Sequence, residues 1–190
     1  MKSMLAAILI FFAAASGASA DFNAGEAALH AGNFERALAE LVPAAARGDA
    51  RAQNALALLY RNGWGVVRDD AHAADLLRRA AKQGFSRAEH NLALLYQAGL
   101  GVERDERQAV EWLKRAARRG YVPSQSDLGF AYYAGQGVPR DLLRAYFWWT
   151  LAASRMDLEA ARAREDIIFM MTPHQKRVAE LLAEQFEPDR

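Results

Sequence analysis

The chain has 190 residues, of which 52% are hydrophobic and 25% are charged, and its 24 Lys and Arg face 23 Asp and Glu. This is the composition of a globular protein, and a formal net charge of +1 argues against a nucleic-acid scaffold. The chain has no cysteine, which excludes disulfides, thiolate metal sites and lipid attachment at a signal-peptide cysteine.

Residues 1–20 have the pattern of a secretory signal peptide. Lys2 gives a positive start, residues 4–15 form an apolar run, and residues 18–20 are the small residues Ala-Ser-Ala. The alternative is a membrane anchor, but the run is shorter than the roughly 20 residues that span a bilayer. We therefore expect cleavage after residue 20, export to the periplasm and no stable membrane anchor afterwards.

Residues 21–47 are expected to form a divergent hairpin of two helices. Gly25, Gly32, Phe34 and Ala37 are spaced as in a helical hairpin of slightly shorter period than the segments that follow. Gly48 closes this hairpin in register with those segments.

Residues 48–157 contain three copies of a segment that recurs every 36 residues. A fixed period in this range predicts a solenoid, because each unit is too small to bury its own apolar face and must stack on its neighbours. Each copy reads as a helix, a turn with two glycines and a second helix. We therefore expect an all-α fold, a right-handed α-solenoid of stacked helix-turn-helix repeats.

Both helices of each copy carry apolar residues at helical spacing. The first helix of the first copy has Ala52, Leu56, Leu59 and Tyr60 on one face. The second helices hold Ala and large apolar residues at fixed positions, so Trp148 and Trp149 are interpreted as core and not as a ligand platform. Second helices are expected to begin after an aspartate N-cap, at Asp69, Asp105 and Asp141, with Gln108 completing a capping box at the second of these.

Residues 158–190 are expected to form capping helices that cover the end of the array. A helix is predicted over residues 158–171, and a second helix is predicted to begin at Thr172, with Gln175 completing a capping box. The second helix would dock over the last repeat, covering residues such as Trp149. Its predicted apolar stripe consists of Val178, Leu181, Leu182 and Phe186.

The repeated pattern resembles the Sel1-like repeat, a relative of the tetratricopeptide repeat. It reads Ala-x-x-x-Leu-Ala-x-Leu-Tyr-x-x-Gly-x-Gly-Val-x-x-Asp and then Ala-x-x-Trp-Leu-x-x-Ala-Ala-x-x-Gly over residues 48–155. The hairpin of residues 21–47 is closer to a plain tetratricopeptide unit, and residues 146–153 and 171–175 resemble the carboxyl end of exported bacterial members. The resemblance implies a protein-interaction module and a partner that is a protein or peptide.

The sequence shows no pattern of a catalytic or cofactor site. It has no phosphate loop, no Gly-x-Ser-x-Gly turn and no His-Glu-x-x-His helix. The histidines His30, His72, His90 and His174 have spacings that suit no common set of metal ligands. We therefore expect no enzyme activity, no cofactor and no bound metal.

The first helices of tetratricopeptide-like arrays line the concave side, which places a candidate groove along them. An apolar track edged by polar groups would suit an extended peptide or a partner helix. Whether these positions instead pack within their own repeats stays open. The groove residues predicted to contact a partner are Asn54, Leu58, Arg61, His90, Leu94, Gln97, Phe130 and Tyr133.

Two other features offer alternative contact surfaces. The basic residues Lys114, Arg115, Arg118 and Arg119 end a second helix, where cations complement the helix dipole, and we interpret them as a solvated face. Trp64 lies between two glycines in a turn, and it could anchor a partner or fold back on its own helix.

The leading functional hypothesis is a periplasmic adaptor or regulator at the cell envelope that binds a protein or peptide in its groove. The alternative is a protein that binds cell-wall ligands or hydrolyses β-lactams, as cysteine-rich relatives suggest, although this chain lacks their cysteines. A purely structural spacer is the third possibility.

Overall fold

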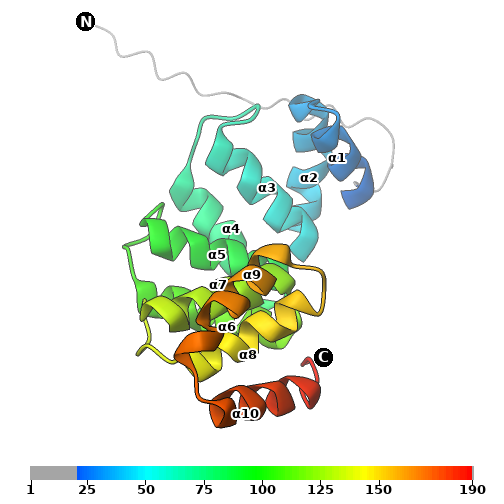
Figure 1. Ribbon diagram of the computed structural model, residues 1–190. Coiled ribbons are helices and arrows are strands. Elements are labelled where there is room, and N and C mark those ends of the chain that lie inside the picture. The colour runs from blue at the N-terminus through cyan, green and yellow to red at the C-terminus, as the bar shows by residue number, and fades with distance from the viewer. Residues whose placement is uncertain (1–20, 190) are drawn as a thin grey trace, which may run out of the picture.

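The computed structural model describes residues 21–189, so the predicted signal peptide lies outside the described residues (Figure 1). Residues 21–189 form ten α-helices and one short 3-10 helix, with no β-strand among them. The helices are α1 (Phe22–His30), α2 (Phe34–Ala46), α3 (Ala50–Asn62), α4 (Asp70–Lys82), α5 (Ser86–Ala98), α6 (Glu106–Arg118), α7 (Val122–Ala134), α8 (Leu142–Ala153), α9 (Leu158–Ile167), η1 (Ile168–Met170) and α10 (Pro173–Glu184).

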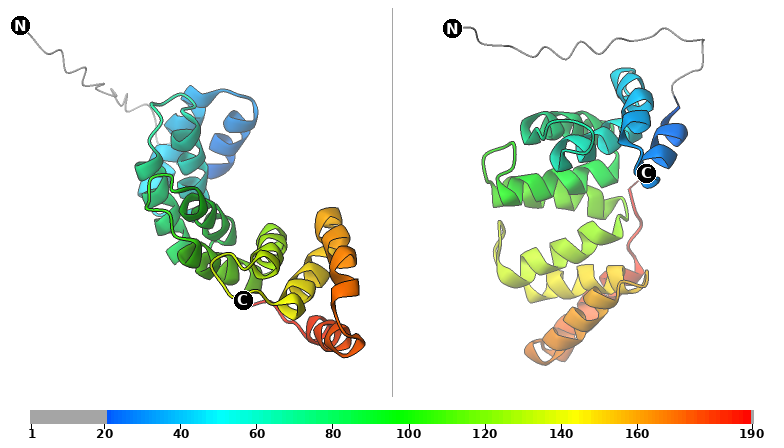
Figure 2. Two further views of the ribbon diagram at one scale, coloured as in Figure 1. Left: turned by 60° about the vertical axis from the view of Figure 1, so that its left-hand side comes forward. Right: turned by 90° about the horizontal axis from the view of Figure 1, so that it is seen from above.

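The helices stack in chain order into a curved array. From α1 to α9, each helix packs mainly against the next one, and Figure 2 shows the stack bending into an arc. The first helices also touch across repeats, α1 with α3, α3 with α5, and α7 with α9. Because helices on the inside of a curved stack approach each other most closely, these first helices line the concave side. The all-α solenoid predicted from the repeat period is confirmed.

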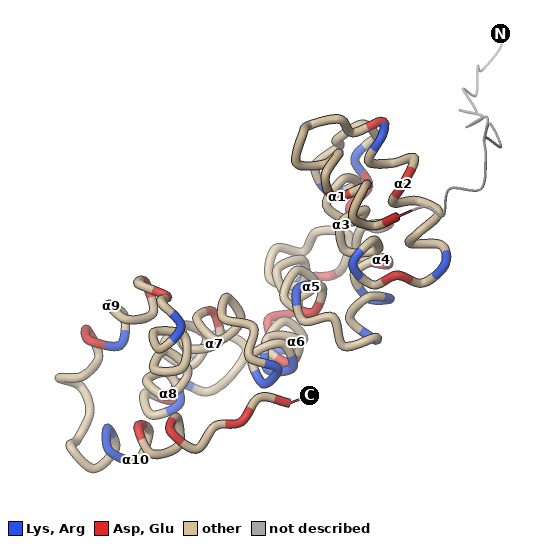
Figure 3. Tube along the Cα trace, turned by 90° about the vertical axis from the view of Figure 1, so that its right-hand side faces the viewer, with Lys and Arg blue, Asp and Glu red and all other residues tan. Residues whose placement is uncertain are grey.

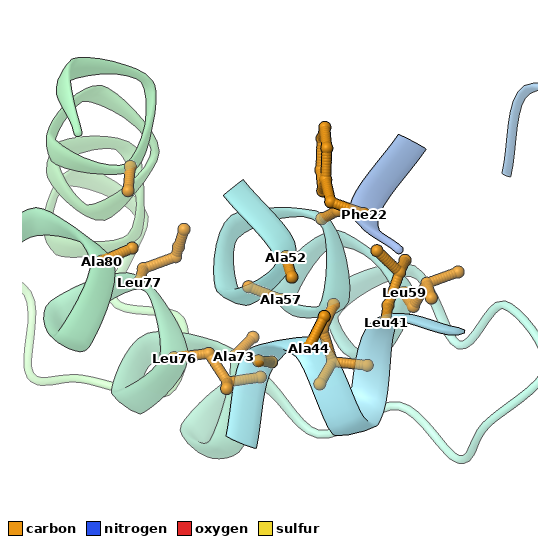
Figure 4. Close-up of a cluster of buried hydrophobic side chains, with 14 of the residues drawn as sticks. Phe22, Leu41, Ala44, Ala52, Ala57, Leu59, Ala73, Leu76, Leu77 and Ala80 are labelled. Atoms are coloured by element: carbon orange, nitrogen blue, oxygen red, sulfur yellow. The ribbon is translucent and has the colours of Figure 1, made fainter. Parts of the chain in front are cut away.

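The core is built from alanines and leucines at repeat-equivalent positions. Ala73 and its equivalents Ala109 and Ala145 are fully buried, as is Leu92 on α5. Figure 4 shows the amino-terminal part of this core, where Leu41 of α2 and Leu59 of α3 lie side by side. Small alanines let neighbouring helices approach closely, and each buried leucine contributes about 1.5–3 kcal/mol relative to exposure.

The second helices begin at the predicted aspartates. The side chains of Asp69, Asp105 and Asp141 each accept hydrogen bonds from backbone N–H groups of the first helical turn. The capping box expected at Asp105 is wrong, because the side chain of Gln108 returns no hydrogen bond to the backbone of Asp105, whereas the backbone N–H of Gln108 does donate to its carboxylate.

The two glycines of each turn have different roles. Gly99 ends α5 in the left-handed conformation, with φ of 67°. Gly101 also has a positive φ, and a Cβ on it would collide with the backbone carbonyl of Asp70 at the start of α4. Gly137 meets the carbonyl of Glu106 in the same way. The second glycine therefore lets each turn press against the preceding second helix.

The third repeat accommodates a larger core residue. Trp148 and Trp149 are buried, which confirms their interpretation as core. The Trp149 indole lies against Gly129, where a Cβ would be only 2.5 Å from its ring. After α8, Met156 takes the place of the helix-ending glycine and adopts a φ of 69°, a left-handed conformation unusual for its side chain.

The carboxyl-terminal helices leave the regular arrangement. The helix predicted over residues 158–171 ends as an α-helix at Ile167 and continues as η1. The capping box of Thr172 and Gln175 is confirmed. α10 packs mainly against α8, whereas a further regular repeat would pack it mainly against α9. In Figure 1, α10 crosses the end of the stack.

The predicted apolar stripe of α10 is wrong in part. Leu181 and Leu182 are 37% and 47% exposed, whereas Ala179 is fully buried. Phe186 packs with the rings of Phe147 and Trp148, at centroid distances of 6.0 and 5.9 Å. Trp149 instead faces α7, where its Nε1 donates a hydrogen bond to the carbonyl of Ser126 at 3.0 Å. α10 has few large buried side chains, so the hydrophobicity of its residues alone could not show which of its faces is buried.

Candidate binding groove

The concave side presents an apolar track that crosses three first helices. Leu58 of α3 and Leu94 of α5 are half-buried, and Phe130 of α7 is 51% exposed. These residues occupy equivalent positions in successive repeats, so the stacking of repeats places them in a row. Two adjoining hollows share Leu94 and Gln97 as lining residues.

The first hollow, between α3 and α5, has a volume of about 600 Å³. Leu94, Leu95, Ala98 and Leu100 form its apolar wall, and its polar lining comes from two guanidinium and two amide side chains. The polar lining residues are Arg61, Asn62, Arg68 and Gln97. Arg68 is paired with Asp70 at 2.6 Å. Arg61 is half-buried, and no carboxylate of residues 21–189 lies within ion-pair distance of it.

The second hollow, between α5 and α7, has a volume of about 310 Å³. Phe130 and Leu94 supply its apolar surface together with Val110. Its charged residues include Asp127 and the ion pair of Arg104 with Glu106 at 2.6 Å. The second hollow therefore contains two carboxylates and one guanidinium, whereas the first contains two guanidiniums and no carboxylate among its lining residues.

Polar side-chain contacts join neighbouring first helices along the groove. The side chain of Asn91 donates a hydrogen bond to Asn54 at 2.8 Å, from α5 to α3. One repeat further, His90 lies 3.7 Å from Asp127 and shares a hydrogen bond of 3.0 Å with Ser124. Asn54 is only 4% exposed, so its side chain is used within the fold and is not part of the groove surface.

Burial shifts the pKa values of His90 and Asp127, the two titratable groups in the contact between α5 and α7. Burial lowers the pKa of His90 from 6.5 to about 4, so its imidazole is neutral at physiological pH. Burial, and to a lesser extent the charge of Asp157, raises the pKa of Asp127 from 3.8 to about 6. At pH 7 the contact between α5 and α7 therefore combines a neutral histidine with an ionised carboxylate.

Tyr133 lies apart from the two hollows. Its ring packs against Trp149 at a centroid distance of 5.8 Å, and the guanidinium of Arg140 lies 5.6 Å from its centroid. The structure thus brings together Arg61, Leu94, Gln97 and Phe130 of the predicted groove residues. Leu58 occupies the equivalent position in the first repeat. His90 and Asn54 line neither hollow and bond to neighbouring first helices, and Tyr133 belongs to the packing of the third repeat.

Several lining residues were not foreseen from the sequence. Arg68 and Arg104 come from the turns after the first helices and reach into the hollows. They are repeat equivalents of each other and of Arg140, so the recurrence of arginine every 36 residues could have pointed to them. Asp127 was missed because it lies beside the predicted track and not on it.

The alternative contact surfaces are largely engaged within the chain. Trp64 stacks on Phe34 at a centroid distance of 5.4 Å and remains 42% exposed, so it folds back on the amino-terminal hairpin. In the basic cluster, Arg119 pairs with Glu89 at 3.1 Å and Lys114 with Glu111 at 2.7 Å. The guanidinium of Arg118 lies 3.4 Å from the carboxylate of Asp189 in the carboxyl-terminal tail. Figure 3 shows this tail returning alongside α6.

The described part of the chain, residues 21–189, contains no helix long and apolar enough to cross a membrane. Within the same range, no three His, Asp or Glu side chains are grouped so that they could hold a metal ion.

The stacked helical hairpins and the groove along their first helices define an α-solenoid repeat protein. Comparison with family models identifies three Sel1 repeats, at residues 50–85, 86–121 and 122–155. The chain belongs to the Sel1 repeat family, as its sequence pattern predicted. Sel1 repeat proteins generally mediate protein–protein interactions, and the family consists typically of non-enzymatic scaffolds.

Solved structures support this assignment. The chain is similar to c5321 of uropathogenic Escherichia coli, a protective antigen with an SLR fold, with 34% identity and a TM-score of 0.75 over 81% of this chain and 33% of that one. A Sel1 repeat protein from Oxalobacter formigenes shares 28% identity, with a TM-score of 0.74 over 77% of this chain and 60% of that one. The chain thus corresponds to about a third of the first structure and three fifths of the second.

A more distant similarity concerns the fold alone. Cysteine-rich protein B of Helicobacter pylori has 19% identity and a TM-score of 0.55, over 68% of this chain and 92% of that one. No functionally curated protein gives a significant match to the chain.

Proposed function

We propose that this protein is an adaptor that binds a segment of another protein in its concave groove. The observation that carries the proposal is the row formed by Leu94 and Phe130, which stays accessible across two adjoining hollows. A half-exposed phenylalanine beside polar groups is costly to leave in water and gives a large contact area to a partner. The polar groups along both edges would pair with the backbone or side chains of that partner.

We propose that the protein acts in the periplasm. Removal of residues 1–20 by a signal peptidase would release the solenoid, starting at Asp21, into the periplasm. Amino-terminal sequencing of the protein extracted from the cell envelope tests this point. A first residue of Asp21 supports export and cleavage, whereas an intact Met1 contradicts cleavage.

We propose further that the protein acts by binding and not by catalysis. The alternative of a protein that binds or hydrolyses β-lactams gains no specific support from the groove, and similarity to the cysteine-rich protein extends to the fold alone. Incubating the purified protein with a chromogenic β-lactam tests the alternative. Hydrolysis above the buffer blank would contradict a purely binding function.

Capture from an envelope extract tests the groove itself. Phe130→Glu places a charge at the α7 end of the track without removing a buried side chain, so we expect loss of the captured partner with unchanged helical content. The control is the pair Arg79→Ala and Lys82→Ala, which changes two exposed residues of the outer helix α4. Loss of capture in the control and retention in Phe130→Glu would contradict the proposal.

A further inference from the structure

The two hollows of the groove differ in charge. The hollow between α3 and α5 is lined by Arg61 and Arg68, by two amides and by no carboxylate. The hollow between α5 and α7 is lined by Asp127 and Glu106 with a single guanidinium, that of Arg104. The apolar residue Leu94 lies at the boundary and lines both hollows. A ligand along the groove therefore meets a cationic half, an apolar boundary and an acidic half in that order.

Arg61 is the central residue of the cationic half. Its equivalents in the next repeats are Gln97 and Tyr133, so an arginine here is not required by the repeat. It is half-buried against the apolar wall, where a guanidinium loses part of its hydration. Among residues 21–189 it forms no ion pair, in contrast to Arg68, which is paired with Asp70. A partly desolvated, unpaired guanidinium is a site for an incoming carboxylate.

We propose that the groove selects an acidic peptide segment in which a carboxylate lies next to a large apolar side chain. This inference rests on the proposed function. The carboxylate binds Arg61 in the hollow between α3 and α5, and the amides of Asn62 and Gln97 donate further hydrogen bonds. The apolar side chain packs on Leu94 and reaches Phe130.

The acidic half fixes the direction in which such a segment binds. Glu106 is paired with Arg104, which leaves the Asp127 carboxylate to repel a second carboxylate at the α7 end. The acidic residues of the ligand therefore gather at the α3 end. Specificity of this kind comes from repulsion as well as attraction. A segment with acidic residues on both sides of its apolar side chain would place one carboxylate beside Asp127 in either orientation.

A random-sequence peptide library displayed on phage tests this inference with the full solenoid, residues 21–190, as bait. We expect enriched peptides to carry Asp or Glu within a few residues of Leu, Ile or Phe. For synthetic versions of these peptides, we expect Arg61→Glu to weaken binding roughly tenfold or more, the scale of a charge-assisted pair, whereas Arg61→Lys retains part of it. The matched control is Arg79→Glu, the same charge change on the outer helix α4.

The outcomes separate this inference from the proposed function. Peptides that depend on Phe130 but lack acidic residues, or that bind Arg61→Glu as tightly as wild type, would overturn the acidic ligand and leave the groove in place. An equal loss of peptide affinity in Arg79→Glu would show that the net charge of the protein, and not the hollow, controls binding. That result would also overturn the acidic ligand. If no peptide prefers wild type over Phe130→Glu, both the inference and the proposed function fail.

Discussion

Glu89 and Arg119 form an ion pair of 3.1 Å at the position where the preceding repeat holds the two amides of Gln53 and Gln83. The Glu89 carboxylate is only 1% exposed, and burial raises its pKa while Arg119 opposes that rise. The same geometry thus joins a first helix to the end of the following second helix by a neutral pair in one repeat and by a charged pair in the next.

Arg119→Gln should therefore destabilise the fold, by on the order of 1–3 kcal/mol, because it leaves a buried carboxylate without its counter-charge. Glu89→Gln together with Arg119→Gln recreates the amide pair of the preceding repeat, and we expect the double variant to regain most of that loss. Urea denaturation of the wild type, both single variants and the double variant measures the coupling. A double variant as unstable as Arg119→Gln would show that the amide pair does not fit this repeat.

The size of the core residues is coupled in the third repeat. Gly129 lies under Trp149, where the earlier repeats have Ala57 with Leu77 and Ala93 with Leu113. Gly129→Ala should destabilise the protein although Ala favours helices, because the added Cβ would lie 2.5 Å from the indole. Combining it with Trp149→Leu should cost less than the sum of the two changes by about 1 kcal/mol. Strict additivity in thermal melts would contradict this coupling.

The sequence was sufficient for the repeat and the fold but not for contacts that depend on its irregularities. A period of 36 residues predicts the stack, and Asp at 69, 105 and 141 predicts where second helices begin. The sequence does not show that α10 docks on α8. The face of α10 that contacts α8 depends on the 3-10 turn of η1 and on small alanines, which stand out little in a hydrophobicity pattern. In the groove, periodicity correctly predicts the track of Leu94 and Phe130. It also places Asn54 in the groove, but this side chain is buried and accepts a hydrogen bond from Asn91.

Phe186, which follows the end of α10, should be the main anchor that holds this helix to α8. Its ring fills the space beside Phe147 and Trp148, so Phe186→Ala should lower stability by on the order of 1–3 kcal/mol. Leu182→Ser changes a side chain that is 47% exposed and should have an effect within about 0.5 kcal/mol. Thermal melts of the two variants distinguish the observed face of α10 from the stripe predicted by sequence. A larger loss in Leu182→Ser would contradict the observed docking of α10.

Deletion of residues 172–190 should expose the aromatic rings that α10 covers. Because exposed apolar patches of this kind promote association, we expect the truncated protein to aggregate. Light scattering of the purified truncated protein measures this aggregation. A truncated protein that stays monomeric with an unchanged melting temperature would show that α10 is not a cap.

His90 and Asp127 should give opposite dependences of stability on pH. The pKa of His90 falls from 6.5 to about 4 on folding, so its contribution, up to about 3 kcal/mol, is present above pH 6.5 and is lost progressively as the pH falls from 6.5 to 4. The pKa of Asp127 rises from 3.8 to about 6, so the folded state gains stability as the pH falls through 6 towards 4. The Asp127 side chain is 41% exposed, and solvent screening makes its effect the smaller one.

Two variants separate these contributions. Asp127→Asn removes the carboxyl group whose protonation offsets part of the loss, so its melting temperature should fall more steeply than that of the wild type between pH 6.5 and 4.5. His90→Gln removes the imidazole whose protonation destabilises the fold, so its melting temperature should fall less steeply over the same range. Identical pH profiles for all three proteins would mean that neither group is buried as the structure places it.

Site-specific photocrosslinking shows whether a partner lies in the concave groove. A photoreactive amino acid replaces Phe130 in the groove in one sample and Arg79 on the outer helix α4 in another, and adducts formed in cells are identified by mass spectrometry. We expect a discrete protein adduct from position 130 that is absent from position 79. An adduct from position 79 with none from position 130 would contradict binding in the groove.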